Sequence, residues 1–225
     1  MTWSTSADAR RYGSTLLQGE RVRFRALEDP DLADLVRWWR DPEWSVLQQM
    51  VVRPRPEAPV TELFRSWSSS ERGGDVGFSV VDRESDVLVG HVTLFGGALP
   101  VRAATLAVMI GAEHVGRGYG TDAVRVLTDY GFREMGLNRI EIRVHAFNDR
   151  ARAVYRTVGY QEEGVRRAAT FHEGRFHDEV VMSVLAHEWA ARTAAPAAPA
   201  AERGAAPTAE QAAAPSPSDG QPPEA

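Results

Sequence analysis

The apolar and polar residues of the chain follow two different periods, and each change of period marks an expected helix or strand. Strict alternation over residues 21–25 predicts a strand. Apolar residues then recur at helical spacing up to Trp39, so we expect a helix whose buried side includes that residue. Asp29 is expected to cap the helix, Pro30 to open it, and residues 40–44 to end it in a turn.

The rest of the pattern predicts a mixed sheet. Further strands are expected at residues 76–82, 87–95, 103–110, 140–144, 163–169 and 179–185, and helices at 59–69, after Gly120 and at 149–158. Consecutive strands favour antiparallel pairs, and the central strand–helix–strand unit favours a parallel pair. The expected fold class is therefore α/β (α+β), with a twisted sheet of about six or seven strands and helices on both faces.

Composition divides the chain into three segments. Alanine and proline make up 21 of the last 35 residues, so residues 190–225 are expected to form a disordered tail. Residues 1–18 are expected to be flexible, which leaves residues 19–189 as the folded domain. No apolar run approaches the roughly 20 residues of a membrane span, and the N-terminus lacks an apolar leader, so we expect a cytoplasmic protein that binds no membrane.

Charge and residue usage exclude several kinds of chemistry. The net charge is −5 and the arginines are scattered, so no basic stripe suggests nucleic-acid binding. The chain has no cysteine, which excludes disulfides, thiolate nucleophiles and cysteine-bound zinc. It has no lysine either, which excludes a Schiff base and a Walker A phosphate loop. We expect no metal cofactor.

A glycine-rich loop carries the main chemical signal. Glycines stand at positions 116, 118 and 120, between an expected strand and an expected helix. Glycine lets a backbone approach a ligand closely, and the first N–H groups of a helix lack intrahelical partners, so the loop suits a phosphate. Arg117 is placed to add a charged contact. The third glycine comes one residue too early for a dinucleotide fingerprint.

This loop resembles motif A of the GNAT superfamily of N-acetyltransferases, written Gln/Arg-x-x-Gly-x-Gly/Ala. Gly118 and Gly120 match its two glycines, whereas Val115 replaces the first residue of the motif. Residues 148–160 resemble motif B, Asn-x-x-Ala/Ser…Tyr…Gly-Phe/Tyr. The runs at 25–29, at 41–43 and from 174 to 189 are similar to the branch of ribosomal-protein N-terminal acetyltransferases, so the resemblance covers nearly all of residues 19–189.

The resemblance implies an enzyme that transfers the acetyl group of acetyl-CoA, its cosubstrate, directly to a primary amine in a ternary complex. It implies that two central strands, 103–110 and 140–144, splay apart around the pantetheine arm, and that main-chain N–H groups near Met109 stabilise the oxyanion. The residues that it assigns to the coenzyme are Ala107, Val108, Met109, Ile110, Val115, Gly116, Arg117, Gly118, Tyr119, Gly120, Thr121, Asn148 and Tyr155.

The resemblance also implies catalytic roles. Tyr155 matches the family tyrosine that protonates the departing thiolate, although it lies on the apolar side of its helix and could be a core residue. Asn148 matches the residue that contacts the coenzyme arm, and it could also cap the helix. For the general base, Glu141 and His145 share one strand face, and Glu28 is a third candidate.

We assign Glu141 a catalytic role and place Glu28, Trp38, Trp44 and His145 in the substrate pocket. His172 and His177 lack a third ligand at metal-like spacing and are expected on the surface. The acceptor is either a protein N-terminus or a small amine. A noncatalytic sensor that binds acyl-CoA is the alternative function, and the protein is expected to be a monomer or a homodimer.

Overall fold

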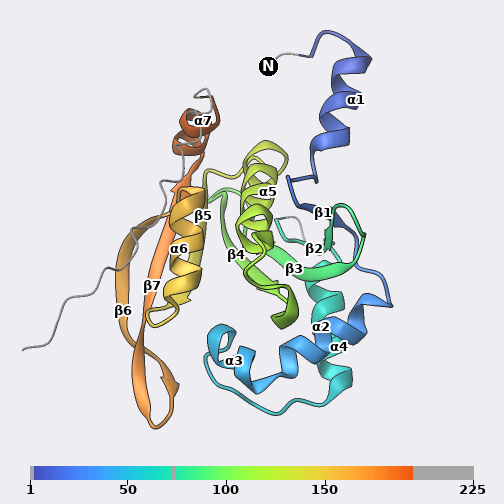
Figure 1. Cartoon of the computed structure of the whole chain (residues 1–225). Helices are drawn as coiled ribbons and strands as arrows, with labels where there is room; N and C mark the ends of the chain where they lie inside the picture. Colours follow the sequence, from blue (N-terminus) through green and yellow to red (C-terminus); the bar gives the residue numbers. More distant parts are fainter. Residues whose placement is uncertain (1–2, 72–73, 195–225) are drawn as a thin grey trace, which may run out of the picture. The chain divides into compact units, whose positions relative to one another are not determined.

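The computed structural model describes residues 3–71 and 74–194, so the expected tail lies outside the described residues from residue 195 onward. Within the described part, seven strands form one sheet in the order β1-β2-β3-β4-β5-β7-β6 (Figure 1). Their bounds are β1 Val22–Arg25, β2 Val76–Asp82, β3 Leu88–Phe95, β4 Ala103–Ile110, β5 Arg139–His145, β6 Gln161–His172 and β7 Arg175–Leu185. Every neighbouring pair is antiparallel except β4 and β5, which confirms the mixed sheet.

Helices cover both faces of this sheet, as the sequence predicts. They are α1 Ser6–Thr15, α2 Asp31–Arg40, α3 Pro42–Gln48, α4 Glu57–Ser68, α5 Tyr119–Arg133, α6 Asp149–Val158 and α7 Ala186–Ala194, with a short 3-10 turn η1 at Ala112–His114. Apolar residues of α5 and α6 pack with the sheet in the larger core cluster. Residues of α2 and α4 form a second cluster, which includes Met109 of β4.

The central strands β4 and β5 separate soon after they meet. Their parallel pairing joins only Ala103 with Arg139, Ala104 with Ile140 and Thr105 with Glu141. Beyond these pairs, β4 continues to Ile110 and β5 to His145. The sheet therefore contains the wedge that the resemblance implied.

The start of α2 differs from the prediction. Pro30, not Asp29, is the N-cap, and the helix begins at Asp31. The Asp31 carboxylate is buried and accepts hydrogen bonds from the Glu28 N–H at 3.0 Å and from Arg25 at 2.7 Å. Burial alone would favour its neutral form, but these hydrogen bonds hold the pKa of Asp31 below its ordinary value.

The turn expected over residues 40–44 is instead the beginning of α3. Asp41 is its N-cap and accepts a hydrogen bond from the Glu43 N–H at 3.0 Å, and Pro42 opens the helix. An aspartate followed by proline is itself a helix-start signal. The chain therefore bends and starts a new helix there, and it carries Trp44 toward the wedge.

Candidate functional site

A cavity of about 670 Å³ lies where β4 and β5 separate. Eight of the residues that the sequence assigned to a coenzyme line it, namely Ala107, Val108, Met109, Ile110, Val115, Gly120, Asn148 and Tyr155. The other assigned residues, Gly116, Arg117, Gly118, Tyr119 and Thr121, belong to the adjoining loop and the first turn of α5. The sequence therefore located one end of the cavity.

The glycine loop at this end presents unpaired main-chain donors. Gly116 and Gly118 have φ angles of 82° and 85°, which other residues adopt only at a cost. Gly118 is the N-cap, so α5 begins at Tyr119, two residues before the expected start after Gly120. Within the described residues, the N–H groups from Gly116 to Thr121 have no protein acceptor. Such a set of N–H groups at a helix start can bind a phosphate.

Gly120 serves this end of the cavity in a different way. A Cβ built on it would come no closer than 3.7 Å to the protein, to Cγ1 of Ile110, so packing does not require a glycine. The missing side chain instead leaves room at the cavity wall. The preceding residue, Tyr119, is anchored, because its hydroxyl donates to the Asp82 carboxylate at 2.7 Å. This bond, together with those from Ser85 and Glu84, lowers the pKa of Asp82 to about 2.

The free edge of β4 supplies further main-chain groups. The Gly111 N–H donates to the Val89 carbonyl at 2.9 Å, just beyond the ladder between β3 and β4. Alternate residues of an antiparallel strand turn their N–H and C=O groups to opposite sides. Those of Met109 therefore turn toward β3, and those of Val108 and Ile110 turn toward the wedge. Of the main-chain groups near Met109, those that face the wedge therefore belong to its two neighbours.

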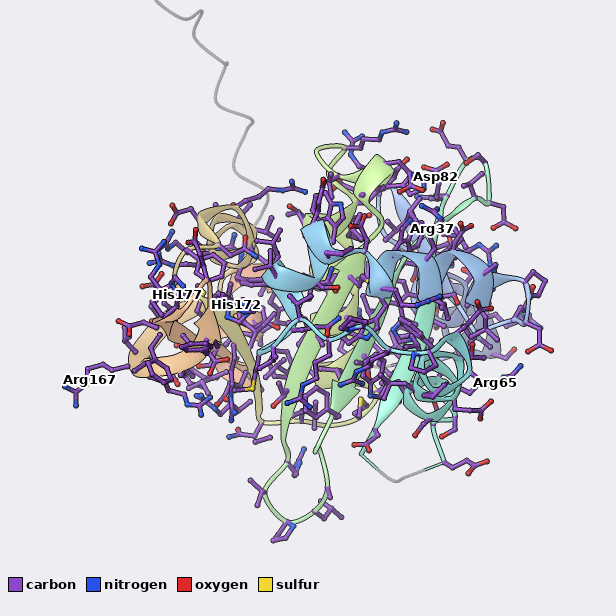
Figure 2. All side chains as sticks on the ribbon, turned by 90° about the horizontal axis from the view of Figure 1, so that it is seen from below. Arg37, Arg65, Asp82, Arg167, His172 and His177 are labelled. Carbon is purple, nitrogen blue, oxygen red and sulfur yellow. The ribbon has the colours of Figure 1, made fainter. Side chains whose placement is uncertain are left out.

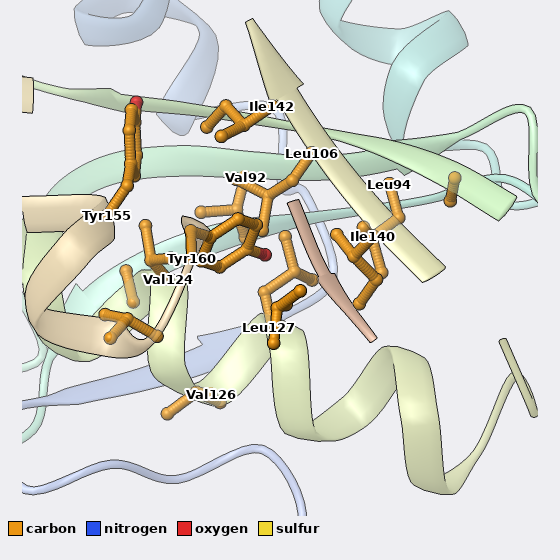
Figure 3. Packing of buried hydrophobic residues seen from close by; sticks show 14 of the residues in the cluster. Val92, Leu94, Leu106, Val124, Val126, Leu127, Ile140, Ile142, Tyr155 and Tyr160 are labelled. Atoms are coloured by element: carbon orange, nitrogen blue, oxygen red, sulfur yellow. The ribbon is translucent and has the colours of Figure 1, made fainter. Parts of the chain in front are cut away.

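Two tyrosines near the end of α6 have different surroundings (Figure 3). The Tyr160 hydroxyl lies in the core and shares a hydrogen bond of 2.9 Å with Thr128. Tyr155 is also buried, but it lines the cavity, and its hydroxyl has no hydrogen-bond partner in the described part of the chain. Burial raises the pKa of Tyr155 above its ordinary value, so it keeps its proton at neutral pH.

Asn148 combines the two roles that the sequence left open. It is the N-cap of α6, where its side-chain oxygen accepts a hydrogen bond from the Ala151 N–H at 3.1 Å. It also lines the cavity, between β5 and α6. A single residue thus fixes the start of the helix that carries Tyr155 and contributes to the cavity wall.

His145, at the end of β5, lines the same cavity and is buried. Its Nδ1 atom has no hydrogen-bond partner among the described residues. Burial lowers the pKa of His145 below 6.5, and the neighbouring His172 lowers it further. The imidazole is therefore neutral at pH 7 and can accept a proton.

The other two base candidates do not line the cavity. Glu141 lies four residues before His145 on the same strand face, but it accepts hydrogen bonds from Arg143 at 2.9 Å and Arg139 at 3.1 Å. Burial raises the pKa of Glu141, but the two arginines outweigh burial and hold this pKa below its ordinary value. Glu28 has a side chain that is 63% exposed, next to Arg25.

The prediction for Trp38 needs correction. It was placed in the substrate pocket, whereas the structure buries it against Gly111, and its Nε1 donates to Glu113 at 2.9 Å. Trp39, expected in the core, is only half-buried and lines the cavity together with Trp44. The expected positions of Trp38 and Trp39 are therefore reversed, because α2 packs against η1 on one side and against α4 on the other.

The sequence missed most of the cavity's far end. Phe64 and Trp67 of α4 and His91 of β3 line it, and with Trp39 they form a set of contacting rings, here called the aromatic pocket. Burial lowers the pKa of His91 to about 4, and its Nε2 atom lies 2.8 Å from the Ser68 hydroxyl. No spacing signal marks these residues, because they lie on separate elements.

His172 and His177, expected on the surface, are both partly exposed and take part in contacts. They lie close together on the hairpin of β6 and β7, with ring centroids 6.3 Å apart (Figure 2). The His172 ring is also 5.7 Å from that of His145, and its Nε2 atom lies 3.1 Å from the Gln49 carbonyl oxygen. The hairpin thus reaches the chain that follows α3, next to the cavity.

Charged groups at the cavity wall are few, and most of them are paired. Glu179 forms an ion pair with Arg166, and Asp75 accepts a hydrogen bond from the Gly96 N–H at 2.7 Å. Arg143 is paired with Glu141. In residues 3–71 and 74–194, no three histidine, aspartate or glutamate residues are grouped to hold a metal ion, and no helix has the length and hydropathy of a membrane span.

Comparison with known proteins gives a consistent result. The family model described as Acetyltransferase (GNAT) domain matches residues 21–161. An uncharacterized N-acetyltransferase, p20, from Bacillus licheniformis is 28% identical over 77% of this chain and 98% of its own length. A putative ribosomal N-acetyltransferase, YdaF, from Bacillus subtilis is 36% identical, over 45% of this chain and 56% of its own.

A solved structure shows the same fold. The spermidine N-acetyltransferase from Vibrio cholerae, in complex with CoA and spermine, superposes with a TM-score of 0.67 at 25% identity. The match covers 75% of this chain and 98% of that protein.

Proposed function

The chain belongs to the GNAT acetyltransferase family and is an N-acetyltransferase, and from this premise we propose that it transfers the acetyl group of acetyl-CoA directly to a primary amine in a ternary complex. One observation carries the proposal. A single cavity joins the free N–H groups of the glycine loop and the open edge of β4 to the aromatic pocket, with Tyr155 and His145 both on its wall.

The residues fit a coenzyme with a diphosphate and an extended amide-bearing arm. The N–H groups between Gly116 and Thr121 bind the diphosphate, and Arg117 adds charge to that contact. Main-chain groups of Val108 and Ile110 pair with the arm, as a neighbouring strand would, and one of their N–H groups binds the carbonyl oxygen. Asn148 contacts the arm from the opposite wall.

Acetyl-CoA supplies a thioester whose carbonyl carbon the amine attacks. His145, neutral at pH 7, takes a proton from the attacking nitrogen. The new C–N bond forms, the C–S bond breaks, and Tyr155 gives its proton to the departing sulfur. No covalent enzyme intermediate is needed, which agrees with a chain that has no cysteine.

Holding both substrates at once has a physical advantage. Residues of the glycine loop and of the aromatic pocket line the same cavity, so amine and thioester can meet at the same strand edge. Correct placement of two reactants converts a bimolecular step into one within a complex and removes much of the entropic barrier.

Thiol release with a panel of amines and N-terminal peptides tests the proposal. Acetyl-CoA should be consumed only when an acceptor is present, and initial rates at varied concentrations of both substrates should give intersecting lines. Parallel lines, or acetylated protein isolated without an acceptor, would exclude direct transfer. Tight binding of acetyl-CoA without thiol release on any acceptor would favour the noncatalytic sensor instead.

A further inference from the structure

We propose that the acceptor amine is attached to an aromatic or bulky apolar group, rather than to a polycationic chain; this inference rests on the proposed function. The aromatic pocket, formed by Trp39, Phe64, Trp67 and His91, is its basis. Its ring centroids lie 5.2 Å apart for Trp39 and Trp67, 5.4 Å for Phe64 and Trp67, and 5.2 Å for Phe64 and His91. All four residues line the cavity.

The rings of this pocket meet edge to face. The interplanar angles are 75° for Trp39 with Trp67, 84° for Phe64 with Trp67 and 82° for Phe64 with His91. A wall of this kind favours a planar apolar group, because a further ring can take up the same edge-to-face or offset arrangement. Trp44, Leu47 and Met50 add apolar lining from α3 and the chain after it.

The charges at the wall select against a polyamine. Among the described residues, only two carboxylates line the cavity, those of Asp75 and Glu179. Glu179 already pairs with Arg166, and Asp75 already accepts a hydrogen bond from the Gly96 N–H. Each ammonium group that leaves water needs a compensating partner, and a polyamine brings several such groups.

Positive charge adjoins the same space. Arg143 lines the cavity on the strand face that carries His145, so its guanidinium, which is paired with Glu141, offers no partner to a second ammonium group there. His91 carries no charge at neutral pH, because burial lowers its pKa to about 4, and its Nε2 atom lies 2.8 Å from the Ser68 hydroxyl. This cavity therefore suits an acceptor with one amine and an apolar body.

Acceptor competition tests the inference on the intact protein. Values of kcat/KM from thiol release are compared for 2-phenylethylamine, ethylamine and spermidine. We expect 2-phenylethylamine to exceed ethylamine by roughly 10- to 100-fold, since the two differ only in the buried ring. We also expect it to exceed spermidine. Equal values for the first two amines, or a higher value for spermidine, would overturn the inference and leave acetyl transfer intact.

A pair of variants assigns the preference to the pocket. Trp67→Leu should raise KM for 2-phenylethylamine and leave ethylamine unchanged, whereas Trp3→Leu, at a residue that is 57% exposed, should change neither. If Trp67→Leu does not fold, the ratio of the wild-type kcat/KM values for 2-phenylethylamine and ethylamine still tests the inference. An unchanged KM in a folded Trp67→Leu variant would overturn the role of the pocket.

Calorimetry separates the two proposals. The amines are titrated into protein saturated with CoA, which lacks the acetyl group and so reports binding alone. If 2-phenylethylamine binds more tightly than spermidine but no amine gives thiol release with acetyl-CoA, the ligand preference stands and the proposed enzymatic function fails. Tighter binding of spermidine would overturn the preference directly.

Discussion

At the glycine-loop end of the cavity the wall is mostly main chain, whereas at the aromatic end it is side chains from four separate elements. N–H groups of the loop and the free edge of β4 form the first end. Rings from α2, α3, α4 and β3 form the second. A main-chain site depends on backbone geometry, so many sequences can preserve it. A side-chain site changes with each substitution, and we therefore propose that acceptor choice is set at the second end.

The largest expected effect concerns Tyr155, which lies between the two ends. Replacing it with phenylalanine removes the proton donor, and we expect kcat to fall about 100- to 10,000-fold, with the affinity for CoA unchanged. The matched control is Tyr160→Phe, which loses the bond to Thr128 and should lower stability by about 1 kcal/mol with little change in kcat. A Tyr155→Phe enzyme with near-normal kcat would show that Tyr155 is only a packing residue.

The next effect concerns the pH dependence of kcat. Protonation of His145 removes the proposed base, so activity should be lost as the pH falls through the pKa of His145, which burial places below 6.5. The plateau should extend above pH 10, because burial raises the pKa of Tyr155. In His145→Gln we expect kcat to fall roughly 100-fold and the acidic limb to vanish.

His187→Gln, at an exposed position on α7, is the control and should keep the wild-type pH profile. If His145→Gln retained the acidic limb, another group would be the base.

A smaller effect is expected at the glycine loop. Gly118→Ala forces a Cβ into a left-handed conformation with a φ of 85°, 3.2 Å from the Arg21 side chain, at a cost of about 1–2 kcal/mol. If the loop relaxes to avoid this strain, the affinity for CoA should fall about 10-fold by calorimetry. Gly13→Ala, in α1 with open space around it, should leave affinity unchanged. Equal affinities in the two variants would mean that the loop does not hold the diphosphate.

The smallest effect is expected for Glu141→Gln. Glu141 does not line the cavity and its carboxylate pairs with Arg139 and Arg143, so the loss should be about 1 kcal/mol of stability or less, seen as a small decrease in Tm. The value of kcat should remain within about two-fold, because no proton transfer is removed. A drop comparable to that of His145→Gln would restore Glu141 as the general base.

The same contrast explains what the sequence could predict. The main-chain end follows from local signals, namely glycines, a helix start and strand order, all within residues 103–121. The strand bounds at 76–82 and 103–110 were correct to the residue because turn residues flank them. Asn148 and its cap were likewise visible in the sequence.

The aromatic end depends on contacts between elements that are distant in the chain. Helical periodicity places Trp39 on the buried side. It carries no information on the position of α4, which packs on that side, or on η1, where Glu113 binds Trp38. His91 and Trp67 show no pattern that distinguishes a pocket wall from an ordinary core. Only the packing of α4 against β3 brings them together.

The brief contact between β4 and β5 has a mechanical consequence. Three residue pairs join the antiparallel ribbon β1–β4 to the ribbon β5–β7 through strand pairing. A cosubstrate arm that is hydrogen-bonded to the exposed edge at Val108 and Ile110 would extend this strand pairing. Binding of the cosubstrate would then make the sheet more rigid, and release of the free thiol would make it more flexible. Amide hydrogens at these two positions should then exchange with solvent at rates that follow each turnover.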